Sequence, residues 1–519
     1  MQSSMMSSLY WKDFRILRPF VFAVVGLLIA LNGFLLLLWW LGELGTTNLA
    51  EFSVTIWILV PNLFLFGAPS LLVGGEEEAG TNAWLRTVPV PWQAVWWSRG
   101  FVTIACGAVI WLLALLQLWM LSLCWGSESF TSRIGWQAGS AVAFFSLLVL
   151  AIAFLCIYTI RSPLFANGAF LFAFLVAVIG CSVLFESVGV GFTERAVVAA
   201  AILAALCGVT AWLARRRMVA PIRIRSIGQV SRLTSYRAPR FVLADRPSPV
   251  ASLMWQQVQQ CWMISALFVS VSWITAAVFW MTNQADRDPW IGLSGGLAPL
   301  SLVIAASSLG ALVFYGDNTR RRFGFFADRG ISPSQLWWTR VLPPAIACVG
   351  LLVSAVLVAT AESRASGQNT TIMMCSIVVV LFAFSQLVSQ WVDRPLLAFF
   401  AGPAYTAVAL LPLVYVIDRF DYPIAMIIFT VPVLLFATRR LMQPWLESQE
   451  KTGLTFRVLG YTGLALLLPC LLMIGESVIM RPFASQIFVT EIEEDDSVSA
   501  STLNADIANV EATAWEDPS

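Results

Sequence analysis

Long uncharged apolar segments recur along the whole chain, and they constrain the fold more than any other feature. The first of them, Val21–Leu41, contains no charged residue. About 20 apolar residues are enough to cross the hydrocarbon core of a bilayer as a helix. Of the 519 residues, 59% are hydrophobic and only 12% are charged, whereas charged residues make up about 25% of an ordinary soluble protein. The sequence therefore predicts an all-α, polytopic integral membrane protein.

The apolar segments predict 12 to 13 transmembrane helices. We expect the first segment to be retained, because it is too long for the apolar region of a signal peptide and lacks a small-residue cleavage site. We take thirteen spans as the working number. The candidate spans are 19–42, 54–75, 101–124, 137–160, 164–186, 197–213, 262–281, 291–315, 341–361, 372–392, 396–416, 422–438 and 458–479.

The basic residues are distributed unevenly between the loops. If the N-terminus is cytoplasmic, 25 of the 31 Lys and Arg residues fall in cytoplasmic segments, and nine of those lie between residues 215 and 246. Cytoplasmic loops of membrane proteins carry such an excess. This predicts a cytoplasmic N-terminus and, with thirteen spans, an acidic tail outside. The composition of that tail predicts disorder, and both a docking function and a purely solvated terminus are open for it.

Two distant stretches of the sequence match one another. Residues Gly75–Arg99 align with Gly316–Arg340 at a constant offset of 241, so that the pair Trp96 and Trp97 meets Trp337 and Trp338. Two shorter matches occur in the same order, 9–12 with 253–256 and 161–164 with 393–396. Such matches indicate a duplicated unit of six spans. Because six is even, the two copies would be parallel repeats, an arrangement that places a pathway between two halves.

The duplication predicts five parts along the chain. They are a first six-span half with an N-terminal cytoplasmic helix (1–214), a basic cytoplasmic linker (215–250), a second six-span half (251–442), an extra C-terminal span (443–480) and the acidic tail (481–519). The linker either binds anionic lipid headgroups or acts only as a topological signal.

A charged interruption follows the second predicted span of each copy. After a break at Gly74–Gly75, the first should form a short helix with Glu76, Glu77 and Glu78 in its first turn and Arg86 in its last, as the helix dipole favours. Pro89 and Pro91 would end it. In the second copy, Asp317 begins the segment, Arg320, Arg321 and Arg322 line it, and Asp328 stands near its end. Trp96, Trp97, Trp337 and Trp338 would anchor the following spans at headgroup depth. The alternative is an ordinary solvated loop.

The first interruption resembles the cytoplasmic coupling segment of ABC-2 type transporter permeases. That segment has an acidic turn, a leucine-rich helix, a proline turn and a basic residue that opens the third span. Arg99 stands where the family often has Lys, and residues 7–19 resemble the amphipathic helix that leads into the first span of the family. The second interruption keeps Asp317 and a proline turn but lacks the acidic motif. The matching positions are Glu76, Glu78, Gly80, Thr81, Leu85, Pro89 and Val90.

The resemblance implies a permease subunit, mostly of exporters, in the plasma (inner) membrane. Its partners would be a cytoplasmic ABC ATPase subunit in two copies and membrane lipid, with no nucleic acid. No G-x-x-x-x-G-K-[ST] phosphate loop occurs in the sequence, so ATP would be bound by the partner, and we expect no cofactor, metal or catalytic residue in this chain. The expected ATPase-coupling residues are Glu76, Glu77, Glu78, Gly80, Thr81, Arg86, Asp317, Arg320, Arg321, Arg322 and Asp328.

Two other classes of function, a secondary transporter and a membrane-embedded enzyme, are less consistent with the sequence. A secondary transporter usually keeps ionisable residues at mid-membrane, but the polar residues near the span centres are uncharged. A membrane-embedded enzyme needs a positioned acid, base or metal cluster, and the sequence has no His. A non-catalytic membrane scaffold is the remaining alternative. The uncharged polar residues line a pathway or bond between helices; they are Asn32, Asn62, Gln117, Asn167, Gln386 and Gln390.

Overall fold

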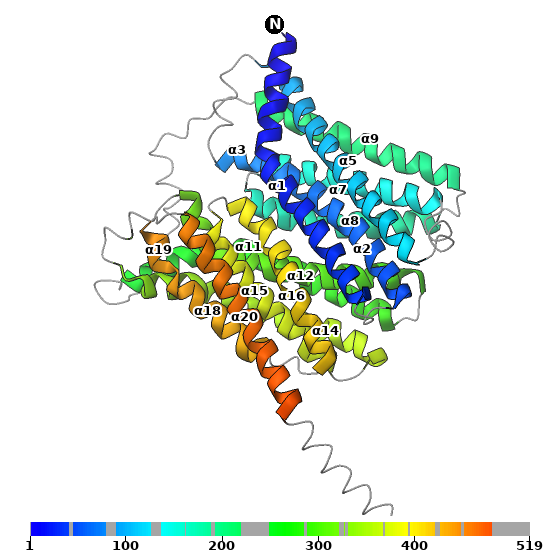
Figure 1. Cartoon of the computed structure of the whole chain (residues 1–519). Coiled ribbons are helices and arrows are strands. Elements are labelled where there is room, and N and C mark those ends of the chain that lie inside the picture. Colours follow the sequence, from blue (N-terminus) through cyan, green and yellow to red (C-terminus); the bar gives the residue numbers. More distant parts are fainter. Residues whose placement is uncertain are drawn as a thin grey trace, which may run out of the picture.

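The protein is a bundle of long helices, in agreement with the all-α prediction (Figure 1). The structure is a computed structural model, and no strand occurs in the part of the chain that it describes. That part comprises residues 2–40, 45–78, 90–125, 136–160, 162–187, 192–219, 249–284, 288–320, 326, 331–366, 369–392, 395–420, 426–447 and 451–479.

The N-terminal group of helices is drawn from blue to cyan-green in Figure 1, and the C-terminal group continues through green and yellow to orange. The first group consists of α1 (Gln2–Trp40), α2 (Thr46–Pro69), the π-helical turn η1 (Ser70–Gly74), α3 (Gly75–Glu78), α5 (Trp92–Trp125), α7 (Trp136–Thr159), α8 (Pro163–Ser187) and α9 (Phe192–Val219). The second consists of α11 (Pro249–Gln284), α12 (Asp288–Arg320), α14 (Pro333–Ser366), α15 (Asn369–Trp391), α16 (Pro395–Phe420), the π-helical turn η2 (Met426–Thr430), α18 (Val431–Arg440), α19 (Met442–Leu446) and α20 (Lys451–Ile479).

Nine of the described helices are long and apolar enough to cross a membrane. Three shorter apolar helices, within α8, α16 and α20, add to them. The chain is therefore a multi-pass membrane protein. The thirteen-span count and the orientation stay predictions.

The helix α1 differs from the expected N-terminus. A separate amphipathic helix that lies along the membrane was expected before the first span, but residues Gln2–Trp40 form one helix with Pro19 inside it. At 1.5 Å per residue this helix is about 58 Å long, well beyond the roughly 30 Å of the hydrocarbon core. Its polar first turns, which carry Lys12 and Asp13, therefore project beyond the apolar part as a rigid continuation of the span.

The two groups repeat one packing scheme. In the first, α1, α2 and α5 pack against one another, and α7 packs on α2, α8 and α9. In the second, α11, α12 and α14 pack against one another, and α15 packs on α12, α16 and α18. The first three long helices of each group thus have largely corresponding neighbours, although α14 also packs on α15.

The contact between the groups is reciprocal, because α1 packs on α16 while α8 packs on α11. Phenylalanines fill the first of these contacts. The ring of Phe400 lies 5.3 Å from that of Phe20 and 5.4 Å from that of Phe66, and Phe66 stacks at 4.3 Å on Phe170. A glycine admits this layer, since a Cβ on Gly67 would lie 2.6 Å from the Phe20 ring.

The closest approach of two backbones lies within the second group. A Cβ built on Gly310 of α12 would lie 2.3 Å from the backbone oxygen of Phe382 and 2.8 Å from the Cβ of Ser385, both on α15. Small residues at such contacts let membrane helices pack backbone to backbone. The contact fixes the position of α12, whose end carries Asp317, relative to α15.

Candidate functional site

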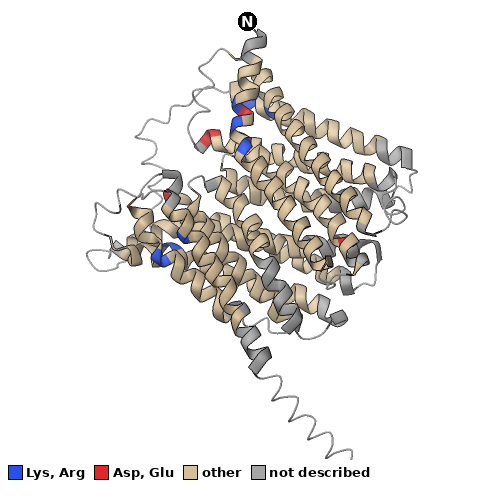
Figure 2. Ribbon diagram, viewed as in Figure 1, with Lys and Arg blue, Asp and Glu red and all other residues tan. Residues whose placement is uncertain are grey.

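Most charged residues of the described chain gather on one side of the bundle. In Figure 2 the blue and red residues lie mainly around the first turns of α1, around α3 and around the end of α18, while the helices between them are mostly tan and one red position lies apart at the right. The segments that carry the charged interruptions, 79–89 and 321–330, join helices on this same side.

The expected break at Gly74–Gly75 is wrong. Gly75 has φ −62° and ψ −35°, an ordinary right-handed helical conformation, so the helix continues from α2 through η1 into α3. Glu76 therefore lies at the end of a long helix and not at the start of a separate one. Its carboxylate is consequently not held at the positive end of a helix dipole, and other groups have to stabilise it.

Glu76 is almost fully buried, and two cations pair with it. Arg99 of α5 and Lys12 of α1 both donate to its carboxylate, Arg99 to Oε2 and Lys12 to Oε1. A buried carboxylate is tolerable only where charged partners and hydrogen bonds replace water. The Glu76 carboxylate thus ties the end of α3 to α1 and α5 in one charged junction, which we call the first network.

Further polar groups extend the first network to other helices. Asp13 lies beside Lys12, with a separation of 3.4 Å between Nζ and Oδ1, and accepts a hydrogen bond of 2.6 Å from Ser98 Oγ. Arg99 Nη1 lies 3.4 Å from the hydroxyl of Tyr158 on α7. These contacts add α7 to the junction and give a second contact between α1 and α5.

Glu77 links the same junction to α9. Arg217 Nη2 donates to Glu77 Oε2 at 2.5 Å, and Arg217 Nη1 donates to the backbone oxygen of Ile157. Arg217 stands in the last turn of α9, and α9 therefore extends into the predicted linker (215–250) as far as Val219. Glu76 and Glu77 thereby tie α3 to α1, α5 and α9.

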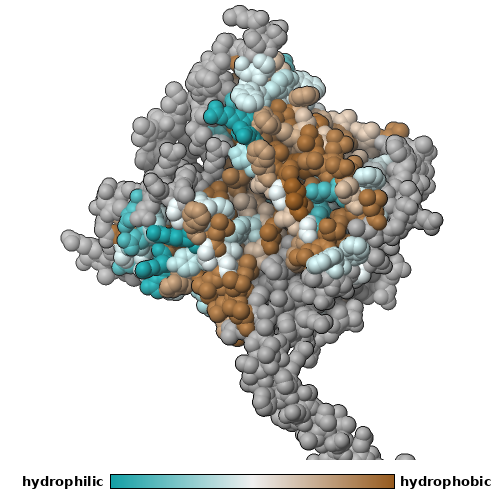
Figure 3. All heavy atoms as spheres, viewed as in Figure 1, coloured by the Kyte–Doolittle hydropathy of each residue, from teal (hydrophilic) through white to brown (hydrophobic). Residues whose placement is uncertain are grey.

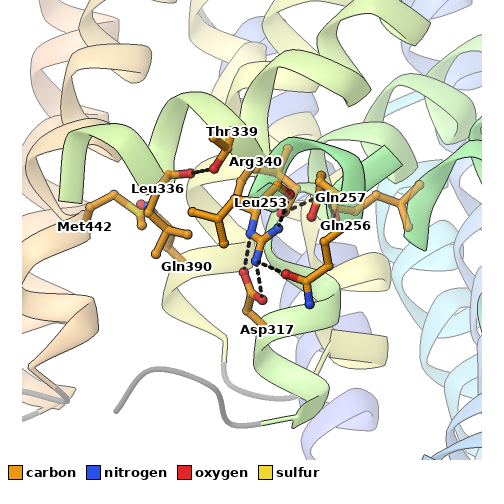
Figure 4. Close-up of polar contacts among 11 residues, drawn as sticks. Leu253, Gln256, Gln257, Asp317, Leu336, Thr339, Arg340, Gln390 and Met442 are labelled. Carbon is orange, nitrogen blue, oxygen red and sulfur yellow. Dashed lines mark hydrogen bonds and ion pairs between the residues drawn. The ribbon is translucent and has the colours of Figure 1, made fainter. Parts of the chain in front are cut away.

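The second network has Asp317 and Arg340 at its centre, both fully buried (Figure 4). Arg340 Nε donates to Asp317 Oδ2 at 2.7 Å, and Arg340 Nη2 donates to Asp317 Oδ1 at 3.0 Å. This bidentate geometry is the strongest form of an arginine–carboxylate pair. It joins the end of α12 to the second turn of α14.

The α11 helix completes the second network with neutral groups. Arg340 Nη1 donates to the backbone oxygen of Leu253 at 3.1 Å, and Nη2 lies 3.4 Å from Gln256 Oε1. The guanidinium also lies 5.3 Å from the centre of the Phe326 ring, within the range of a cation–π contact.

The two networks share a spacing and differ in charge. In each, an acid and an arginine 23 residues apart join the end of one long helix to the start of the next. A residue of the preceding long helix adds to each pair. In the first network this is charged Lys12, and in the second it is neutral Gln256. Among the described residues, Lys12 and Arg99 both pair with the central carboxylate of the first network, and Arg340 pairs with that of the second.

The predicted tryptophan anchors occupy different environments. Trp97 and Trp338 are exposed, and Trp96 is partly buried. Trp337 is buried, and its indole N–H donates to Thr438 Oγ1 at 3.0 Å. Gln386 Nε2 also donates to that hydroxyl, at 3.2 Å, so Trp337 joins α14 to α15 and α18 within the protein.

Five of the six uncharged polar residues expected near the span centres bond between helices, whereas Asn62 donates to the backbone oxygen of Ile58 within α2. Asn32 of α1 donates to Gln117 Oε1 of α5 at 2.7 Å, and Ser70 Oγ donates to Asn167 Oδ1 of α8. Gln390 Nε2 donates to the backbone oxygen of Thr438 at 2.9 Å. Of the two interpretations that the sequence leaves open, these contacts favour bonding between helices.

The structure therefore brings together only part of the predicted coupling residues. Glu76, Glu77 and Asp317 lie in the two networks. Arg320 ends α12, Glu78 ends α3, and their side chains lie outside the described part of the chain, as do Gly80, Thr81, Arg86, Arg321, Arg322 and Asp328 altogether.

The sequence-based prediction did not pair Arg99 and Arg340 with the acids. The signal was present, because each arginine stands about two turns inside an apolar helix, where a charge has to be paired.

In the described residues, no cluster of three metal-ligating side chains occurs. No protein-family model matches the chain, and no curated protein or solved structure matches it either.

Proposed function

We propose that the chain is the membrane-spanning permease subunit of an ABC-type transporter, an exporter that a separate cytoplasmic ATPase drives. The observation that carries the proposal is the pair of matched networks. Each ties the helix before a charged interruption to the helix after it, through a buried acid and an arginine 23 residues further on. A loop that was only a solvated turn would need no such fixation.

The networks would transmit force. A force applied to residues 79–89 would be transmitted to α5 through Arg99, to α1 through Lys12 and to α9 through Arg217, because each of these cations pairs with a carboxylate of α3. A push on residues 321–330 would reach α14 through Asp317 and Arg340. Ion pairs in a low-dielectric interior resist separation far more than pairs in water, so each junction moves as a unit.

The arrangement of the helices supports two halves that rock against each other. We propose that residues 1–214 and 251–442 are parallel repeats, related by an axis along the membrane normal, as in other two-half transporters. The reciprocal packing of α1 on α16 and of α8 on α11 fits that symmetry. The phenylalanine layer between α1, α2, α8 and α16 would then close the pathway between the halves.

The remaining parts of the proposal follow from this scheme. Two ATPase copies would bind the two charged segments on the cytoplasmic side of the plasma (inner) membrane, where the N-terminus also lies. With thirteen spans, α20 would be the last of them and the acidic tail would lie outside. ATP would be held by the partner, since the phosphate-binding loop does not occur in this sequence.

A charge reversal in the first segment tests the coupling. Glu76 and Glu77 hold other helices, so their reversal would disturb the fold, and Arg86→Glu is the better change. In the reconstituted complex, we expect this variant to lose about tenfold or more of the transport-linked ATPase activity, comparable to the loss of a charge-assisted contact of about 1.4 kcal/mol or more. Hydrolysis is measured in proteoliposomes, with Arg439→Glu as the control on the same side of the membrane. Equal activities of the two variants would argue against coupling through this segment.

A secondary transporter is the second candidate. The cluster of Lys12, Asp13, Glu76 and Arg99 favours it, since ionisable groups buried in helices often carry protons. Proteoliposomes that contain the chain alone discriminate the two. Transport driven by a proton gradient without any ATPase would support the secondary transporter and contradict the ABC-type permease.

A further inference from the structure

A cleft of about 740 Å³ lies between the end of α18, α19 and the first half of α20. Its volume falls in the range of small-molecule and cofactor sites. Arg440 contributes to one wall and Arg457 to the other, while Gly460, Tyr461 and Leu464 extend along α20. Neither of the two networks described above contributes a residue to it.

The cleft is positively charged. Arg440 and Arg457 form no ion pair with any residue in the described ranges, whereas Lys12, Arg99, Arg217 and Arg340 all do. The acid on the rim, Glu447, accepts a hydrogen bond of 3.0 Å from Gln443 Nε2. Two guanidinium groups therefore face the cleft against one carboxylate, which favours an anion with several oxygens.

Each arginine stands at the end of an apolar helix face. On α20, Leu464, Leu467 and Leu471 are exposed and follow Arg457 at helical spacing, so they share its face. On α18, exposed Phe436 precedes Arg440 by one turn. Figure 3 shows the same order, with hydrophilic residues gathered over the end of α18 and α19 and a hydrophobic field directly beyond them.

An occupant of this site needs an anionic head and an apolar body. A soluble phosphate would use the arginines but would leave the apolar faces of α18 and α20 without a partner. A phospholipid uses both, because its phosphate lies at headgroup level and its acyl chain lies along the adjoining helix faces. Basic pockets between transmembrane helices bind anionic headgroups in this way.

We propose that this cleft binds one anionic phospholipid, with its phosphate between Arg440 and Arg457 and an acyl chain along Leu464. The lipid would join α20 to α18 and hold the last apolar helix against the bundle. The inference does not depend on the proposed transport function.

Native mass spectrometry of the purified protein tests the site, with phosphatidylglycerol and phosphatidylcholine as probes. We expect one tightly held phosphatidylglycerol per chain and no equivalent phosphatidylcholine. Arg440→Ala combined with Arg457→Ala should weaken the binding about twenty-five-fold, since each arginine near the headgroups contributes on the order of fivefold. Arg439→Ala, which removes a neighbouring exposed arginine outside the cleft, should leave the binding unchanged.

A second pair of variants distinguishes binding of the lipid in the cleft from nonspecific electrostatic attraction to the arginines. A Cβ on Gly460 or on Gly463 meets no atom within 4 Å, but only Gly460 lines the cleft. Gly460→Phe should therefore abolish the tight binding while both arginines stay, and Gly463→Phe should not. Equal binding by these two variants, or by the double arginine variant and wild type, would overturn the proposal. Displacement of the lipid by millimolar inorganic phosphate would overturn it in favour of a soluble anion.

Discussion

Replacement of Arg340 by Met is expected to lower the free energy of unfolding by about 3–5 kcal/mol, the usual cost of leaving a buried charge without its partner. Asp317 would stay in the interior with the two hydrogen bonds from Arg340, at 2.7 and 3.0 Å, removed. The loss is measured by thermal or denaturant unfolding of the purified protein in detergent.

A double variant distinguishes the ion pair from simple loss of packing. When Asp317→Leu accompanies Arg340→Met, no charge is left buried, and we expect at least half of the lost stability to return. Arg439→Met serves as the control, because that side chain is exposed and makes no ion pair within the described chain. A double variant no more stable than Arg340→Met alone would show that the charge pair does not hold α12 to α14.

Gly310→Ala is expected to be nearly as damaging, although it adds a single methyl group. The new Cβ would lie 2.3 Å from the backbone oxygen of Phe382 and 3.0 Å from the backbone nitrogen of Gln386. Backbone atoms cannot relieve the clash by a change of rotamer, as a side chain can, so α12 and α15 would have to separate. Overpacking of this kind costs about 1–3 kcal/mol and occasionally more, and we expect about 3 kcal/mol in the same unfolding measurement.

Gly208→Ala is the matched control for this change. It lies in the middle of α9, and a Cβ there would meet no atom within 4 Å. Alanine is the better helix former, so this variant should be as stable as wild type or slightly more stable. Similar melting curves for the two variants would show that α12 and α15 do not approach as closely as the structure has them.

The helical architecture could be predicted from the sequence because it depends on local composition. Uncharged runs such as 101–124 leave a membrane helix as the one way to satisfy the backbone, and α5 covers that run. The ends of the helices were harder to predict from the sequence. Glycines 74 and 75 suggested a break, but glycine permits a turn without requiring one, and the buried surroundings of η1 keep the helix continuous.

The site was predictable only in part, because the sequence shows which residues are charged but not which helices pack together. Glu76 and Asp317 stood out as charges that interrupt apolar sequence. Their partners depend on how helices pack, since Lys12 and Glu76 are 64 residues apart. The offset of 241 aligned Arg99 with Arg340 as well as Glu76 with Asp317, yet nothing in a spacing of 23 residues says that the two ends meet. Whether the acid and the arginine meet depends on how the helices pack against one another.

The most direct test of a motor-driven permease is the composition of the complex in its native membrane. The chain is extracted in mild detergent, purified by a tag, and weighed intact with its partners. We predict one copy of the chain together with two copies of a cytoplasmic nucleotide-hydrolysing subunit. Isolation of the chain alone from membranes in which it is active, with no such subunit at any step, would contradict the proposed function.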